Sequence, residues 1–465
     1  MVILYFTILI IYSSLSLFYY EQRKLINSLG TFLLCIVSSV LVSNLITGLN
    51  LVWWNVNIFA PDNSLSEMGK FSLLAISLFF LFLNANEKRQ DQMQAYPTSL
   101  MGNFILLFTC GAVLFDSLLS FYFFYELVWL LLMYLLGLLF YQEKSSFYRI
   151  FINIMFGSTL VNIFCILSLS SLMTTKLSFF NLNAQTLMEL SNIKSTELNT
   201  DFLFYILIGI LILKTIFPVF YTAQLESNQK KLQSYIFNIQ VAVNTVLAVY
   251  VLTVFFKDRL KIIFSNLAWG HVALPLTLIF LGSFYIIRLK TNDNFFKSIL
   301  FGYNIIFISS IMLIAPISSK MVCLFTSHFL ILFGVTNVIN EILKDRFGSQ
   351  TLWMPLSLKK NMPKFFFLLM TWMVVVCGFP WSSGNLVKMF YLSKLANQPL
   401  FAIYLWSIFV FMLLLLFIPF ILNVKKIGKN KEEIETVPDV NIFEFSMLFL
   451  LISAELLLGL GGQYF

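Results

Sequence analysis

The most demanding chemistry in this sequence lies in residues 377–392, which read CGFPWSSGNLVKMFYL within a long apolar run. Three potential helix breaks lie there, at Gly378, Pro380 and Gly384, and Lys388 follows them. Broken helices are tolerated at membrane depth only where the loosened backbone is buried in protein or lines a water-filled cavity. A lysine at that depth is costly unless it is paired or hydrated. We therefore expect an ion or substrate site around Lys388.

Two more ionisable residues lie deep within apolar runs. Glu126 is in FYFFYELVWLL, and Lys214 is in ILILKTIFP, four residues before Pro218. Burial disfavours the charged form of a lysine, and a nearby carboxylate restores it, which is the balance that a proton relay needs. A snorkelling side chain or a structural ion pair would explain any one of these residues alone. Lys214 and Lys388 each accompany a proline in separate halves of the chain, however, and paired interrupted helices are typical of transporters built from inverted repeats.

The histidines and one further glutamate complete the candidates. His328 lies inside an apolar run and could carry a proton, because imidazole titrates near neutrality, although a structural hydrogen bond explains it equally well. His271 is expected at a membrane interface and receives no role. Glu455 lies in the last apolar run and is interpreted as a structural or interface residue.

Composition defines the elements that must position these residues. Of the 465 residues, 59% are hydrophobic and 11% are charged, whereas soluble proteins have about a quarter charged residues. The chain is therefore expected to be an all-α polytopic membrane protein. Its abundant Phe, Leu, Ile, Asn and Lys are favoured by AT-rich codons, which indicates an organellar genome. The five cysteines show no metal-ligand or redox spacing.

Because a transmembrane helix needs about 20 apolar residues, the apolar runs predict fourteen transmembrane helices. They cover residues 2–20, 28–49, 69–86, 98–116, 117–141, 147–173, 202–223, 232–256, 272–290, 296–316, 320–342, 364–394, 399–424 and 441–463. The seventh and twelfth are expected to be broken, at Pro218 and around Pro380. Loops after odd-numbered spans hold most of the 30 basic residues, so the positive-inside rule places both termini outside. Topology thereby explains the net charge of +8 without nucleic-acid binding.

Three motifs, in order, carry a resemblance to a known family. The segment GFPWSSGNLVKMFYL is similar to the glycine- and proline-rich run with a lysine in helix twelve of NADH dehydrogenase subunit 2, an antiporter-like membrane subunit of mitochondrial respiratory complex I. DSLLSFYFFYEL, which ends with Glu126 and Leu127, resembles the helix-five segment of that family. IGILILKTIFP resembles its helix-seven lysine before a proline. Subunit 4 of the same superfamily resembles the chain less, since it typically has glutamate in place of Lys388.

The resemblance implies an architecture and roles. It implies two inverted antiporter-like repeats, residues 98–256 and 257–424, preceded by three helices in residues 1–97 and followed by a charged loop and last helix in residues 425–465. Glu126 and Lys214 would form the charge pair of the first half-channel, and Lys388 would be the terminal lysine of the second. Protons would cross in steps that are coupled to quinone reduction elsewhere in the complex.

The resemblance also implies partners and a location. Those are other membrane-arm subunits in the mitochondrial inner membrane, lipid, and a respiratory supercomplex as a further candidate assembly, with the termini on the intermembrane-space side. No nucleotide loop, haem signature or flavin signature occurs in the sequence. NADH, flavin, iron–sulfur clusters and ubiquinone are therefore expected on other subunits, with no cofactor or metal on this chain.

One departure from the family leaves alternatives open. The family places a lysine in helix eight, but residues 232–256 contain no ionisable side chain except tyrosine, and Asn244 or Val243 occupies that position. Asn244 and Gln240 could hold water, but amides do not store a proton. A structural complex I subunit with impaired conduction, or a stand-alone cation/proton antiporter, are the alternative readings.

Overall fold

The described parts of this computed structural model are helical and contain no strand. They comprise residues 2–18, 22–47, 67–85, 92–114, 118–140, 146–173, 197–224, 230–255, 319–347, 362–376, 381–386, 389 and 438–461. The chain divides into two compact units, Met1–Ala268 and Trp269–Phe465. Six described helices are long and apolar enough to cross a membrane, so the chain is a multi-pass membrane protein.

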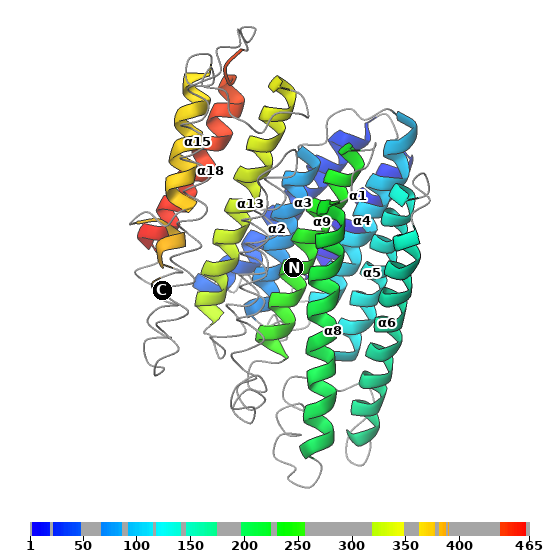
Figure 1. Cartoon of the computed structure of the whole chain (residues 1–465). Helices are drawn as coiled ribbons and strands as arrows, with labels where there is room; N and C mark the ends of the chain where they lie inside the picture. Colours follow the sequence, from blue (N-terminus) through cyan, green and yellow to red (C-terminus); the bar gives the residue numbers. More distant parts are fainter. Residues whose placement is uncertain are drawn as a thin grey trace, which may run out of the picture. The chain divides into compact units, whose positions relative to one another are not determined.

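The first unit holds eight described helices (Figure 1). These are α1 (Val2–Phe18), α2 (Arg23–Thr47), α3 (Glu67–Ala85), α4 (Gln92–Leu114), α5 (Leu118–Phe140), α6 (Ser146–Met173), α8 (Glu197–Gln224) and α9 (Lys230–Val254). Helix α9 is the core of this unit, because it packs against α3, α4, α5 and α8 and its span Tyr235–Val254 is 89% buried. Helix α6 contacts α5 and α8, and its span Phe151–Ser168 is only 28% buried.

Polar contacts link the first four helices inside their apolar packing. The hydroxyl of Tyr5 on α1 lies 2.7 Å from that of Ser77 on α3 and 3.3 Å from the thiol of Cys110 on α4. The amide of Asn103 on α4 donates to Asn27 on α2 over 3.2 Å. Inside a membrane, buried polar groups of this kind must find partners within the protein, so these contacts fix the order in which the helices meet.

The second unit has three described helices, α13 (Ser319–Phe347), α15 (Pro363–Val376) and α18 (Ile442–Gly461), each packed against the other two. Asn441 caps α18 in a reciprocal arrangement with Glu444, whose backbone N–H donates to the Asn441 side chain over 2.7 Å. Glu444 also pairs with Arg346 of α13 at 3.1 Å.

The described helices correspond in position to spans predicted from the sequence. Each of the eleven overlaps one predicted span, and the ninth, tenth and thirteenth spans lie outside the described residues. The count of fourteen and the two inverted repeats therefore stay predictions. The break expected at Pro218 is wrong, since α8 continues through this residue. Proline removes one N–H, which would otherwise bind the carbonyl of Lys214, but the flanking helical bonds and packing against neighbouring helices keep the segment intact.

The twelfth span departs from one straight helix. Helix α15 ends at Val376, and Trp381 has a left-handed φ of 77°. A new turn then begins at Ser382, whose carbonyl accepts from the N–H of Asn385 over 3.1 Å. Gly384 lies within that new turn, not at a break, whereas Gly378, Pro380 and Lys388 fall outside the described residues.

Candidate functional site

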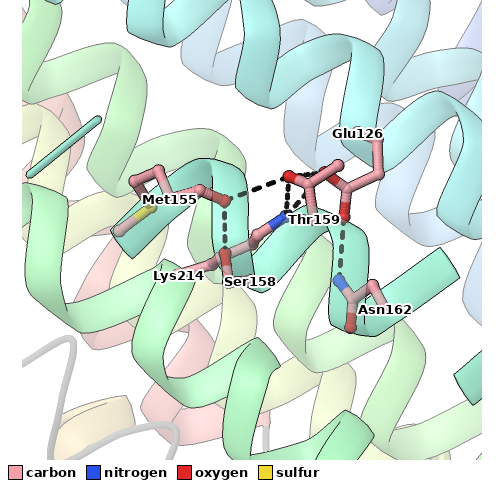
Figure 2. A network of polar contacts seen from close by, with 6 residues as sticks. All are labelled: Glu126, Met155, Ser158, Thr159, Asn162 and Lys214. Carbon is pink, nitrogen blue, oxygen red and sulfur yellow. Dashed lines mark hydrogen bonds and ion pairs between the residues drawn. The ribbon is translucent and has the colours of Figure 1, made fainter. Parts of the chain in front are cut away.

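A buried ion pair joins two helices of the first unit (Figure 2). The ammonium of Lys214 on α8 lies 2.5 Å and 2.6 Å from the two carboxylate oxygens of Glu126 on α5. The side chain of Lys214 is 1% exposed and that of Glu126 is 12% exposed. Two of the residues singled out from the sequence, 88 positions apart, are thus brought into direct contact.

Helix α6 supplies the groups that complete the pair. Thr159 donates to Glu126 Oε2 over 2.7 Å and accepts from Lys214 over 3.0 Å. Asn162 donates to Glu126 Oε1 over 2.8 Å. The sequence reasoning missed both residues, because one threonine and one asparagine in an apolar helix carry no distinctive pattern. Their three-residue spacing, which places them on one face of a helix, is the only signal that could have pointed to them.

The hydrogen bonds of the Lys214 ammonium are complete. An ammonium has three N–H donors, and those of Lys214 meet Glu126 Oε1, Glu126 Oε2 and Thr159 Oγ1. The ring centroid of Tyr125 lies 5.7 Å from the same nitrogen, within the range of a cation–π contact. A desolvated ion pair survives only when its remaining polar atoms are satisfied in this way. The short contact between an acid and a base also gives a proton a direct path between them.

A second polar group lies about two turns further along α8. The Thr222 hydroxyl lies 2.6 Å from Gln240 Oε1 of α9 and 2.5 Å from the carbonyl of Pro218. Gln233 donates to the carbonyl of Thr222 over 2.7 Å. Because residues 214, 218 and 222 recur every four positions, they follow one side of α8. The side chain of Lys214, its carbonyl, which lacks the usual helical donor because residue 218 is proline, and Thr222 therefore form a polar row.

Asn244 is the unusual residue of α9. It is fully buried, and neither its amide nitrogen nor its amide oxygen has a partner among the described residues. Gln240 Nε2, one helical turn earlier, is also without one. The pairing of Thr222 with Gln240 in the antiparallel helices α8 and α9 places Asn244 near the level of Pro218, which has no N–H to donate to the carbonyl of Lys214. Unsatisfied buried amides of this kind commonly hold ordered water.

The second unit contains a separate titratable cluster. His328 Nδ1 of α13 lies 2.6 Å from Glu455 Oε1 of α18. Ser383 donates to the same oxygen over 2.5 Å, and the N–H of Gly384 donates to it over 3.2 Å. The sequence reasoning singled out His328 but not its partner. Glu455, interpreted from sequence as a structural or interface residue, is a buried member of this cluster.

The predicted site residues therefore divide into three groups. Glu126 and Lys214 are in contact, and His328 makes its contacts in the second unit. Pro218 lies in a continuous helix, and Gly384 lies in the turn beside His328. Lys388, Gly378 and Pro380 lie outside the described residues, so their roles stay predictions.

No protein-family model and no curated protein matches the chain. Solved structures do match. A chain of respiratory complex I from Thermus thermophilus with bound NADH aligns with a TM-score of 0.69 and 16% identity, covering 100% of this chain and 96% of that one. A chain of the Mrp complex from Dietzia aligns at 0.63 and 13%, covering 99% and 94%. A chain of an archaeal membrane-bound sulfane sulfur reductase, a respiratory membrane complex, aligns at 0.67 and 15%, covering 98% and 75%. These likenesses establish the fold, which this chain shares over its whole length with chains of those three complexes.

Proposed function

We propose that this chain is a proton-translocating membrane-arm subunit of a respiratory complex I, related to NADH dehydrogenase subunit 2. The observation that carries the proposal is the Glu126–Lys214 pair, buried where three apolar helices meet and completed by Thr159 and Asn162. The shared fold with a chain of a complex I supports the assembly. The three sequence motifs support the choice of subunit.

In the proposed mechanism, Lys214 and Glu126 are both charged in a buried site that is shielded from bulk water. While they face each other, each stabilises the charged form of its partner. When a neighbouring charge draws Glu126 away, or neutralises it, the isolated Lys214 ammonium loses that stabilisation and releases its proton. The polar row along α8 and the amides of Gln240 and Asn244 give the released proton a hydrated route. Lys388 and His328 are the proposed carriers of the second half.

The proposed setting is the mitochondrial inner membrane, with both termini on the intermembrane-space side. Other membrane-arm subunits and lipid are the proposed partners, and a respiratory supercomplex is a candidate larger assembly. NADH oxidation and quinone reduction would take place on other chains, which would hold the flavin, the iron–sulfur clusters and the ubiquinone. This chain would contribute a proton path to that enzyme and no redox site.

Two other functions have a specific observation in their favour. The fold likeness to a chain of the Mrp complex favours a cation/proton antiporter outside complex I. The neutral Asn244 in the middle of α9 favours a structural subunit of complex I with impaired conduction, since no described side chain of α9 at that depth stores a proton at neutral pH.

Native electrophoresis of solubilised membranes, with mass spectrometry of the NADH-active band, distinguishes a complex I subunit from an antiporter outside complex I. The chain is expected in a very large assembly with NADH dehydrogenase activity, and its absence from that band would refute membership of complex I. Proton yield per NADH in vesicles, compared between the wild type and Lys214→Met, distinguishes a proton-translocating subunit from a structural one. An unchanged yield in a fully assembled variant would leave the chain a structural subunit.

A further inference from the structure

The turn Trp381–Leu386 is held to α18 by one carboxylate oxygen. Glu455 Oε1 accepts hydrogen bonds from the Ser383 hydroxyl, from the Gly384 backbone and from His328. Two of these three donors belong to the turn itself. The turn also begins with Trp381 in a left-handed conformation, which non-glycine residues adopt only where their surroundings impose it. Glu455 is therefore the hydrogen-bonding group on α18 that holds this strained segment, and Gly459 of the same helix lets the backbone of Trp381 approach closely.

The same carboxylate is incompletely satisfied. Glu455 is 4% exposed, and its second oxygen, Oε2, has no partner within the described part of the chain. A buried carboxylate with three donors on one oxygen and none on the other is poised to take a proton or a water molecule. The side chain of His328 keeps 13% of its surface exposed, and the described residues offer its Nε2 no hydrogen bond. Nε2 is therefore the imidazole atom at which the cluster has room for one more proton.

No other described ionisable side chain competes for this proton at close range. On α13, Cys323 lies five residues before His328, about 7.5 Å along the axis, and Arg346 lies about 27 Å beyond it. On α18, Glu444 lies about 16 Å from Glu455 and pairs with Arg346. On α15, the titratable residue is Lys364 at the first turn, where Asp439 accepts from its backbone N–H. His328 and Glu455 are therefore the described ionisable side chains in direct contact beside the turn.

We propose that His328 and Glu455 bind one exchangeable proton between them, and that this proton controls how firmly the Trp381–Leu386 turn is held to α18. This inference stands whether or not the chain conducts protons. With Glu455 ionised and His328 neutral, all three hydrogen bonds end on a charged acceptor. A proton taken up at His328 Nε2 raises the charge of the cluster from −1 to 0. The Nδ1 proton then crosses to Glu455 Oε1, which leaves a neutral imidazole and a carboxylic acid.

The consequence for the turn follows from hydrogen-bond strength. Bonds to an ionised acceptor are roughly twice as strong as bonds between neutral groups. Protonation weakens the Ser383 and Gly384 bonds together, and both of these donors belong to the turn that begins with the strained Trp381. The ligand of the site is thus a proton, Glu455 and His328 bind it, and Ser383 is a positioning residue that transmits its presence to the turn.

Infrared titration of the full-length chain in its native assembly, reconstituted in lipid vesicles, tests the proton. A protonated-carboxyl band is expected to appear as the pH falls, to vanish in Glu455→Gln, and to remain in the control Glu444→Gln on the same helix. Ser383→Ala removes one donor to the carboxylate, so the band should appear at a pH about one unit higher, a tenfold change in proton affinity. His328→Gln should move it in the same direction.

Amide hydrogen exchange of the peptide that contains residues 381–386 tests the coupling. After normalisation to Glu455→Gln at each pH, which cancels the intrinsic pH dependence, wild-type exchange should rise about tenfold as the band appears. If no titrating band disappears in Glu455→Gln, or if Ser383→Ala leaves its midpoint in place, the shared proton is refuted. If the band titrates but exchange of the turn does not follow it, the control of the turn is refuted. If Glu455→Gln does not fold, the smaller change Ser383→Ala still tests the proposal through the midpoint of the carboxyl band.

Discussion

The Lys214 ammonium meets both carboxylate oxygens of Glu126, at 2.5 Å and 2.6 Å, across 88 positions of sequence. Thr159 of α6 touches both members of the pair. The arrangement combines a high desolvation cost with a full set of hydrogen bonds, so each charge depends on the other for its stability. That mutual dependence is what makes the pair both a structural element and a candidate proton carrier.

Removing one member of the pair should destabilise the protein more than removing both. Glu126→Gln or Lys214→Met leaves a buried charge without its partner, at a cost of about 3–5 kcal/mol. The double variant leaves no uncompensated charge and should unfold at a higher temperature than either single variant. Thermal unfolding in detergent measures the stability, and proton yield should be lost in all three variants. Recovery of proton yield in the double variant would show that the pair is structural only.

Thr159 should matter through its hydroxyl and not through its volume. Thr159→Val keeps the shape but removes a donor to Glu126 and an acceptor for Lys214, so we expect a loss of about 1–3 kcal/mol in stability and slower proton transfer. Thr159→Ser should retain both. Thr253→Val is a matched control, because the partners of the Thr253 hydroxyl among the described residues are backbone carbonyls of its own helix. Equal effects of the two valine variants would contradict the assigned role.

Asn244 should be hydrated. Both polar atoms of its fully buried amide are without a protein partner among the described residues, and each would cost about 1–3 kcal/mol if left dry. A high-resolution map should show ordered water within hydrogen-bond distance of this amide. Asn244→Leu would displace that water and should slow proton transfer with little gain in stability. A dry site, together with a clearly stabilised Asn244→Leu protein, would favour the structural, non-conducting reading.

Pro218→Ala should tighten α8. The new N–H can bind the carbonyl of Lys214, so the helix should gain up to about 3 kcal/mol, the usual cost of an interior proline. We expect a higher unfolding temperature and a lower rate of proton transfer, because a polar group leaves the row beside Lys214. Pro363→Ala is the control, since Pro363 is the first residue of α15, where no helical donor is missing. Faster transfer in Pro218→Ala would contradict the proposed role of the free carbonyl.

Gly384→Ala should disturb the second unit. A Cβ at this position would lie 2.8 Å from Cε1 of His328, so the imidazole must move away from Glu455. We expect lower stability and an altered infrared titration of Glu455. Gly209→Ala on α8 is the matched control, because its Cβ would meet nothing within 4 Å, and it should stabilise its helix by about 0.5–1 kcal/mol. An unchanged titration in Gly384→Ala would show that His328 does not set the protonation of Glu455.

Sequence reasoning predicted the helices and the ionisable candidates because both depend on local properties. An apolar run of about 20 residues specifies a transmembrane helix by itself, and the described helices overlap their predicted spans. Glu126 and Lys214 stood out because charges in such runs are costly and therefore rare. The helix break at Pro218 was wrongly predicted for a related reason. The missing N–H is visible in the sequence, whereas the packing that tolerates it is not.

Tertiary structure alone decided which polar residues serve the charges. Thr159, Asn162 and Ser383 look like ordinary polar residues in apolar segments. Only the contacts of α6 with α5 and α8, and of the turn with α18, give them their partners. The pairing of His328 with Glu455 joins residues 127 positions apart. Sequence periodicity places a side chain on a face of its own helix, but the neighbour of that face is chosen by packing between helices. That choice pairs Glu455, interpreted from the sequence as a structural or interface residue, with His328.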